Sequence, residues 1–243
     1  MHNPIILFDF DGVILTQRGL EYAALILKRD NWFDWQNNEK LRLIDYARIF
    51  EEADLFGKRE SMKALNRTYQ IYIPNRFKRW IFFSKFRRKF QRFEKIYDSL
   101  RPGLKEILEL LKKREIPMGI ISNTSKKRLN YFKKKFNLES YFSIFLSRED
   151  TKNYKKPHPY AIYLALKKIK DKFNFKKIHL DNVFFIGDLP SDIKCAKAAG
   201  VNSVAVLSGH GRKKDLLNLK PDYVIQDAKD IINIESLKKF LTN

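Results

Sequence analysis

The sequence has few cysteines, few acidic residues and no long apolar runs, and each shortage narrows the class of protein. Cys195 is its single cysteine, which excludes an internal disulfide and fits a reducing compartment. No apolar run approaches the roughly 20 residues that a membrane span requires. Asp9 and Asp11 also interrupt the N-terminal apolar stretch that a signal peptide would need. We therefore expect a soluble, cytoplasmic protein.

The charge balance is strongly basic, because 28 Asp and Glu stand against 49 Lys and Arg and leave a net charge of +21. Such a surplus favours anionic partners, whether phosphorylated small molecules, nucleic acid or lipid headgroups. With 44% hydrophobic residues in 243, the chain can bury a sizeable core, which excludes a disordered protein. Its length fits one large domain or a core with one insertion.

Short apolar segments alternate with helical patterns over most of the chain. The spacing predicts a helix ending near residue 114 and further helices over 125–136, 159–170, 190–199 and 228–240. Strand candidates are residues 4–10, 117–123, 143–147, 182–188, 202–207 and 221–225. This alternation predicts an α/β fold with a Rossmann-like, doubly wound parallel sheet that helices cover on both faces.

Residues 18–98 differ from the rest of the chain. Helical spacing recurs there without a convincing strand, over residues 20–30, 39–56, 59–72 and 76–97. The block lies between the first predicted strand and the remainder of the sheet. We therefore predict two domains: a catalytic core made of residues 1–17 and 99–243, and an inserted all-helical cap, or lid, of residues 18–98.

Polar residues stand at the ends of three predicted strands, where an open parallel sheet binds its ligands. They are Asp9, Asp11 and Gly12, then Ser122, Asn123 and Thr124, then Gly187, Asp188 and Asp192. Two carboxylates about 4 Å apart repel by roughly 4 kcal/mol at an effective dielectric near 20. The four acids therefore predict either a protonated member or a bound cation. Oxygen ligands without a Cys or His pair nearby favour Mg2+.

Groups suited to phosphate are expected at the same edge. Ser122 offers a hydroxyl, and the helix that begins near Ser125 offers unpaired N–H groups at its N-terminus. Lys156, in "KKPHP", precedes a proline that can start the next helix. Each piece alone also fits a turn, a helix cap or a solvated lysine. Together, and in this order, they favour a carboxylate nucleophile, a second carboxylate for proton transfer, a cation and donors for a phosphoryl group.

The segments "DFDGVI", "ISN", "KKPHPYAIYLAL" and "FFIGDLPSDIKCAKAAGV" resemble, in the same order, the four motifs of the haloacid dehalogenase (HAD) superfamily. Residues 101–231 look most like its phosphoglycolate phosphatase and beta-phosphoglucomutase branch. The resemblance implies that Asp9 attacks phosphorus to form an aspartyl-phosphate, and that Asp11 protonates the leaving oxygen and then activates water. The implied phosphate-binding residues are Gly12, Ser122, the amide of Asn123, and Lys156. The implied Mg2+ ligands are Asp9, the carbonyl oxygen of Asp11, and Asp188, with Asp192 close by or acting through water.

The expected function is a Mg2+-dependent phosphatase, similar to phosphoglycolate phosphatase, that acts on a small phosphorylated substrate as a monomer or weak homodimer. A sugar phosphomutase, a phosphonate hydrolase, and a protein that binds nucleic acid or an anionic membrane stay open as alternatives. The last rests on residues 76–95, which hold nine basic residues and one acid, Glu94. A helical projection places Trp80 and five phenylalanines within an arc of about 160°, with most of the cations opposite. A lid helix with a buried aromatic face is therefore the simpler interpretation.

Overall fold

The computed structural model of the chain describes residues 4–16, 18–29, 75–152 and 154–241. The chain divides into two compact units, one of residues 1–16 and 100–243 and one of residues 17–99. The second unit is an insertion, because its residues lie between the first strand and the first helix of the larger unit. The predicted boundaries differ from this division by one residue at each junction, and the role of the insertion as a cap stays a prediction.

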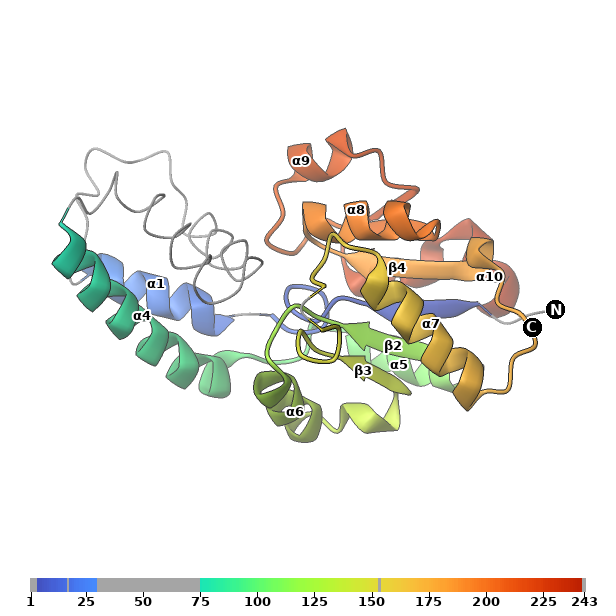
Figure 1. The fold of residues 1–243 in the computed structure, drawn as a ribbon, viewed down its shortest axis with the longest axis horizontal. Coiled ribbons are helices and arrows are strands. Elements are labelled where there is room, and N and C mark those ends of the chain that lie inside the picture. Colours follow the sequence, from blue (N-terminus) through green and yellow to red (C-terminus); the bar gives the residue numbers. More distant parts are fainter. Residues whose placement is uncertain (1–3, 17, 30–74, 153, 242–243) are drawn as a thin grey trace. The chain divides into compact units, whose positions relative to one another are not determined.

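The larger unit is built on a parallel sheet in the strand order β3-β2-β1-β4-β5-β6 (Figure 1). The strands are β1 (Ile5–Phe8), β2 (Met118–Ile121), β3 (Ile144–Leu146), β4 (Val183–Gly187), β5 (Asn202–Val206) and β6 (Tyr223–Ile225). Each lies within one of the six predicted segments. The central strand β1 pairs with β2 and β4, so that Phe8 lies opposite Ile120 and Ile186. All four β1 residues are buried, as expected of a strand covered on both faces.

Helices cover both faces of the sheet (Figure 1). α5 (Leu104–Lys113), α6 (Lys126–Lys135) and α10 (Glu235–Leu241) share one apolar core with Ile6 and Phe8 of β1. α7 (Tyr160–Lys172) and α8 (Pro190–Ala199) share the other with Ile5 and Leu7. Successive side chains of one strand thus enter opposite layers. The predicted Rossmann-like, doubly wound fold is confirmed.

The C-terminal part of the core differs from the predicted helix over 228–240. It forms a 3-10 helix, η3 (Ala228–Asn233), and then α10, with Ile234 extended between them. The Asp227 backbone N–H donates to the Asp230 carboxylate, which starts a short turn of its own. Ile234 and Leu237 are both buried in the core. The short helix α9 (Lys213–Asn218) was not predicted, because six residues are too few for a helical period to show.

The described part of the inserted unit consists of two helices, α1 (Arg18–Arg29) and α4 (Arg76–Tyr97). Asn75 begins α4, because its side-chain oxygen accepts hydrogen bonds from the backbone N–H groups of Phe77 and Lys78. The Asp98 carboxylate after α4 accepts the Gly19 N–H at 2.7 Å, which ties the two helices together. The predicted helices over 39–56 and 59–72 lie outside the described residues.

The exposed face of α4 carries basic side chains and also an aromatic one. Phe82 and Phe86 are buried, as predicted, whereas Trp80 is 63% exposed. Placing Trp80 on the buried face was wrong, because it stands at the very end of the predicted arc. Arg88 and Arg92 are exposed on the same helix.

No helix among the described residues combines the length and the apolar character that crossing a membrane requires.

One ion pair joins the start of α5 to the loop after β6. The Arg101 guanidinium donates to Asp227 Oδ2 at 2.7 and 3.1 Å, and the Ser208 hydroxyl donates to the same oxygen. Burial acts to raise the pKa of Asp227, but the hydrogen bond and charge of Arg101 outweigh it and leave this pKa below its ordinary value. The pair therefore stabilises the fold at pH values above the ordinary carboxyl pKa, and this contribution is lost as the pH falls through the lowered pKa.

We expect Asp227→Asn to lower the free energy of unfolding by about 2 kcal/mol at neutral pH, because the variant loses a charge-assisted hydrogen bond. Urea denaturation of both proteins from pH 7 down to pH 3 measures the difference. The gap between wild type and variant should close in the acid range, while Asp181→Asn, an exposed carboxylate, should show no gap at any pH. A gap that is the same at every pH would contradict the assignment.

Candidate active site

The strand order creates one crevice at the carboxyl end of the sheet. The chain winds from β1 through β2 to β3 and then returns to β4 on the other side of β1, so the strand order reverses between β1 and β4. Ligands of open α/β sheets bind at this kind of switch point. Asp9 follows β1, Ser122 follows β2 and Asp188 follows β4. The topology thus brings together three of the predicted site residues.

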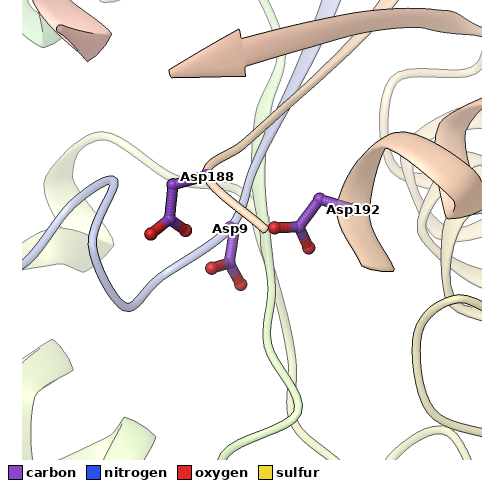
Figure 2. A group of neighbouring side chains, drawn as sticks. All are labelled: Asp9, Asp188 and Asp192. Atoms are coloured by element: carbon purple, nitrogen blue, oxygen red, sulfur yellow. The ribbon is translucent and has the colours of Figure 1, made fainter. Parts of the chain in front are cut away.

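Three carboxylates form a cluster at this point. One oxygen each of Asp9, Asp188 and Asp192 lies within 4.8 Å of the others. Figure 2 shows Asp192 extending from α8 toward the two acids at the strand ends. Asp9 is 4% exposed and the other two are completely buried. The repulsion expected between such charges is therefore not relieved by water.

Lys156 is the cation of this cluster. Its ammonium makes an ion pair with Asp9 Oδ1 and another, at 2.7 Å, with Asp192 Oδ1, and it is 4% exposed. It also lies 3.4 Å from the carbonyl oxygen of Ile121, at the end of β2. One ammonium among three carboxylates leaves two negative charges unmatched within this group of four.

The titration behaviour follows from this imbalance. Burial raises the pKa of Asp9 well above its ordinary value, Lys156 lowers it, and Asp192 and Asp188 raise it further. Burial alone would lower the pKa of Lys156, but Asp192 and Asp9 outweigh it and raise that pKa. The lysine therefore stays charged, and a further cation would relieve the remaining repulsion between the carboxylates. Three carboxylates with a surplus of two charges fit Mg2+, a hard divalent ion that takes oxygen ligands.

Glycines surround the cluster, because there is no room for a side chain beside it. A Cβ on Gly12 would lie 2.8 Å from the Asp188 carboxyl carbon, and the positive φ of 78° at Gly12 also disfavours other residues. A Cβ on Gly187 would collide with Asp192, and one on Gly209 with Asp188. Of these three, sequence reasoning did not single out Gly209.

The loop after β5 fixes Asp188. The His210 backbone N–H donates to Asp188 Oδ2 at 2.7 Å, and the His210 side chain is 5% exposed. In the structure, the backbone N–H of His210 makes the contact with the cluster.

The segment after β2 performs two tasks. Ser122 is buried, and its Oγ accepts the Thr124 backbone N–H at 3.1 Å. The Asn123 side chain accepts the Lys156 backbone N–H at 3.0 Å and donates to the Lys156 carbonyl oxygen at 3.4 Å. Asn123 therefore positions the lysine loop through its side chain, a contact that the sequence does not reveal. Ser125 caps α6 by accepting the Arg128 N–H.

Asp11 is separate from the three clustered carboxylates. Its carboxylate pairs with Arg128 of α6 at 2.7 Å. Sequence reasoning missed Arg128, although a signal exists. Ser125 is the cap of α6, so Arg128 lies in its first turn, and helical side chains point back toward the N-terminus. A basic residue at this position is therefore directed at the strand ends.

Cys195 behaves as a packing residue. It is fully buried on α8, and its thiol lies 3.4 Å from the His158 carbonyl oxygen. Burial raises the pKa of this thiol to about 12, so that it remains protonated near neutral pH. It lacks the thiolate character of a nucleophile.

Comparison with known proteins fits this geometry. A profile of the haloacid dehalogenase-like hydrolase family matches residues 6–206. The chain belongs to this family. The predicted superfamily and the predicted class of enzyme, a HAD-type hydrolase, are thereby confirmed.

Individual relatives match the chain over different shares of its length. A Caldanaerobacter subterraneus protein named for the pyrophosphatase PpaX is 26% identical over 234 residues, which cover 96% of this chain and 95% of that protein. A Photorhabdus laumondii phosphoglycolate phosphatase is 31% identical over 156 residues, which cover 60% and 63% of the two chains. A Thermotoga maritima structure named for beta-phosphoglucomutase has a TM-score of 0.65 and 21% identity, and covers 97% and 99%. This last likeness shows the fold.

The glycines of the HAD site give a prediction about the metal. Gly209→Ala would force a methyl group into the Asp188 carboxylate, so we expect Mg2+ binding to weaken by about 10- to 100-fold. Isothermal titration calorimetry with Mg2+ measures this loss. Gly200→Ala is the matched control, since its Cβ would meet only Leu180, at 3.7 Å. It should lose about 1 kcal/mol of stability through its positive φ and bind Mg2+ as the wild type does. Equal affinities for all three proteins would contradict a metal at Asp188.

Proposed function

We propose that this HAD hydrolase is a Mg2+-dependent phosphatase that acts on a small phosphomonoester through an aspartyl-phosphate on Asp9. The observation that carries the proposal is the position of Asp9. It is a buried carboxylate at the switch point of the sheet, paired with Lys156 and flanked by two further carboxylates. Relatives named for phosphoglycolate phosphatase and a pyrophosphatase support phosphoryl chemistry.

Asp9 is the proposed nucleophile. Its Oδ1 pairs with Lys156, which holds the carboxylate in place and counters the effect of burial on its charge. The other oxygen is then the one that attacks phosphorus, with the leaving oxygen on the opposite side. Because the Asp9 carboxylate and the phosphoryl group that it attacks are both anions, the attack needs positive charge nearby.

The phosphoryl oxygens would be held by the segment after β2 and by Lys156. Ser122 Oγ accepts a hydrogen bond from Thr124, so its own proton can be donated to a phosphoryl oxygen. The backbone N–H of Asn123 and Gly12 complete the proposed set of phosphate-binding groups. Lys156 offsets the charge of both the nucleophile and the phosphoryl group.

Asp9, Asp188 and Asp192 would hold Mg2+, with the carbonyl oxygen of Asp11 as a further proposed ligand. When bound, this ion weakens the repulsion between the nucleophile and an anionic phosphoryl group and stabilises charge on the phosphoryl oxygens. The hydrogen bond from the His210 backbone orients Asp188 for this task.

Asp11 would carry the protons. Its carboxyl group gives a proton to the oxygen that leaves phosphorus. It then takes a proton from the water that hydrolyses the aspartyl-phosphate, which releases phosphate and restores Asp9. Two carboxylates two residues apart thus have different roles, one as nucleophile and one as acid and base.

The substrate class rests on relatives and on the inserted unit. We propose that residues 17–99 act as the cap that selects a small phosphorylated molecule. A sugar phosphomutase would use the same aspartyl-phosphate, but the likeness to a structure named for such an enzyme shows the fold alone. Hydrolysis is therefore favoured, and binding of nucleic acid or membrane by α4 stays a prediction of the basic sequence.

Removal of the nucleophile is the direct test. Asp9→Asn preserves size but removes the attacking carboxylate, so phosphate release from para-nitrophenyl phosphate in Mg2+ should fall by about 10³-fold or more. Chelation of Mg2+ should stop the wild type as well. Asp171→Asn, an exposed acid on α7, is the control and should keep full activity. A fully active Asp9→Asn protein would rule out the assigned nucleophile.

A panel of substrates separates the phosphatase from the mutase. Phosphoglycolate should release phosphate faster than a hexose phosphate does, measured as inorganic phosphate with Mg2+. Interconversion of hexose phosphates that requires a bisphosphate primer would instead identify a mutase. Activity on none of these compounds would move the substrate outside the class that we propose.

A further inference from the structure

The ion pair between Arg128 and Asp11 connects α6 to the loop after β1. Arg128 Nη1 lies 2.7 Å from Asp11 Oδ1 and 2.8 Å from Oδ2, so one nitrogen contacts both carboxylate oxygens. The same nitrogen lies 3.2 Å from the Thr124 hydroxyl. The two charged side chains are 15% and 17% exposed, and such shielding from water strengthens the pair relative to one on the surface.

Two aromatic rings hold the guanidinium in place. Its central carbon lies 5.2 Å from the centre of the Phe132 ring and 5.9 Å from that of Phe10, and both rings are fully buried. These are cation–π distances, and the rings limit the positions that the guanidinium can take. Phe10 stands between the two aspartates in sequence. Arg128 therefore packs against Phe10 and pairs with Asp11, which are neighbouring residues of one segment.

The arrangement gives the two neighbouring aspartates different cations. Asp9 pairs with Lys156, whereas Asp11 pairs with Arg128. Among the described residues, the carboxylates gathered closely enough to share a metal ion are Asp9, Asp188 and Asp192, and Asp11 is not one of them. Something other than the metal cluster must therefore determine where the Asp11 carboxylate lies.

We propose that Arg128 is a positioning residue for Asp11, which it holds at the place from which the carboxyl group exchanges a proton with the leaving oxygen. The inference rests on the proposed function, because it assumes that Asp11 transfers this proton. A merely structural ion pair would serve only to tie α6 to the loop after β1. The two roles differ in their dependence on the leaving group.

An aryl phosphate and an alkyl phosphate separate the two roles. A phenolate leaves phosphorus without needing a proton, whereas an alkoxide needs one in the transition state. Arg128→Met keeps much of the side-chain volume but removes the cation that fixes Asp11. The parameter to measure is kcat/KM, which reports the steps up to formation of the aspartyl-phosphate. The alkyl substrate is phosphoglycolate or glycerol phosphate, whichever the wild type hydrolyses faster, and the aryl substrate is para-nitrophenyl phosphate.

We expect Arg128→Met to lower kcat/KM by about 10- to 100-fold for the alkyl phosphate and by less than about threefold for the aryl phosphate. Arg128→Lys should recover part of the loss, because a single nitrogen makes both contacts with Asp11. Asp11→Asn should show the same asymmetry in a stronger form. Lys127→Met, one residue away and exposed, removes the same charge and should change neither value.

Thermal unfolding of each variant shows whether the fold is retained, and a folded Arg128→Met protein with equal losses on both substrates would overturn the inference. So would a folded variant with no loss on the alkyl phosphate while Asp11→Asn is impaired. In both cases the proposed function stands. A wild type that hydrolyses neither substrate would overturn the proposed function, and the inference with it.

Discussion

The burial of three carboxylates beside a single lysine is the constraint on which the rest of the structure depends. Taking one ionised group out of water costs several kcal/mol even in a relaxed protein, and here four such groups share one place. Such a cluster contributes little to stability, since an apolar core of the same volume would serve the fold at least as well. Its retention at the switch point of the sheet is therefore better explained by chemistry than by folding.

The surrounding architecture keeps this cluster in place. The strands are short and apolar, and the buried acids stand at or beside their carboxyl ends. Asn123 fixes the loop that carries Lys156, and the loop after β5 orients Asp188 through its backbone. Glycines beside the carboxylates let the backbone approach Asp188 and Asp192 closely, because a Cβ at these positions would collide with them. Each of these contacts thus holds one charged group of the site in place.

The sequence predicted most of the fold, because buried parallel strands leave short apolar runs and helices leave a period. The site could be proposed for a related reason: acids and a hydroxyl at strand ends converge once the sheet is parallel. Arg128 escaped notice because one arginine among 49 basic residues does not stand out, although its place in the first turn of a helix that begins at Ser125 directs it at the strand ends. Trp80 was misplaced because it stands at the end of the aromatic arc, and a helical projection alone does not show where the buried face of the helix ends. The substrate has no comparable signature, since the inserted unit carries no recognisable motif.

The loop after β1 does more than hold an acid. Leu15 forms a parallel bridge with Asp11 and an antiparallel bridge with Leu100, and Leu100 is where the chain re-enters the core after the insertion. The outgoing and returning connections of the insertion therefore run side by side, and both are fastened to the backbone that carries Asp11. A cap exchanged in evolution or by engineering would inherit this attachment. Under the proposed function, selection for a new substrate at the insertion and selection for proton transfer at Asp11 would act on the same few residues, and neither trait would vary wholly independently of the other.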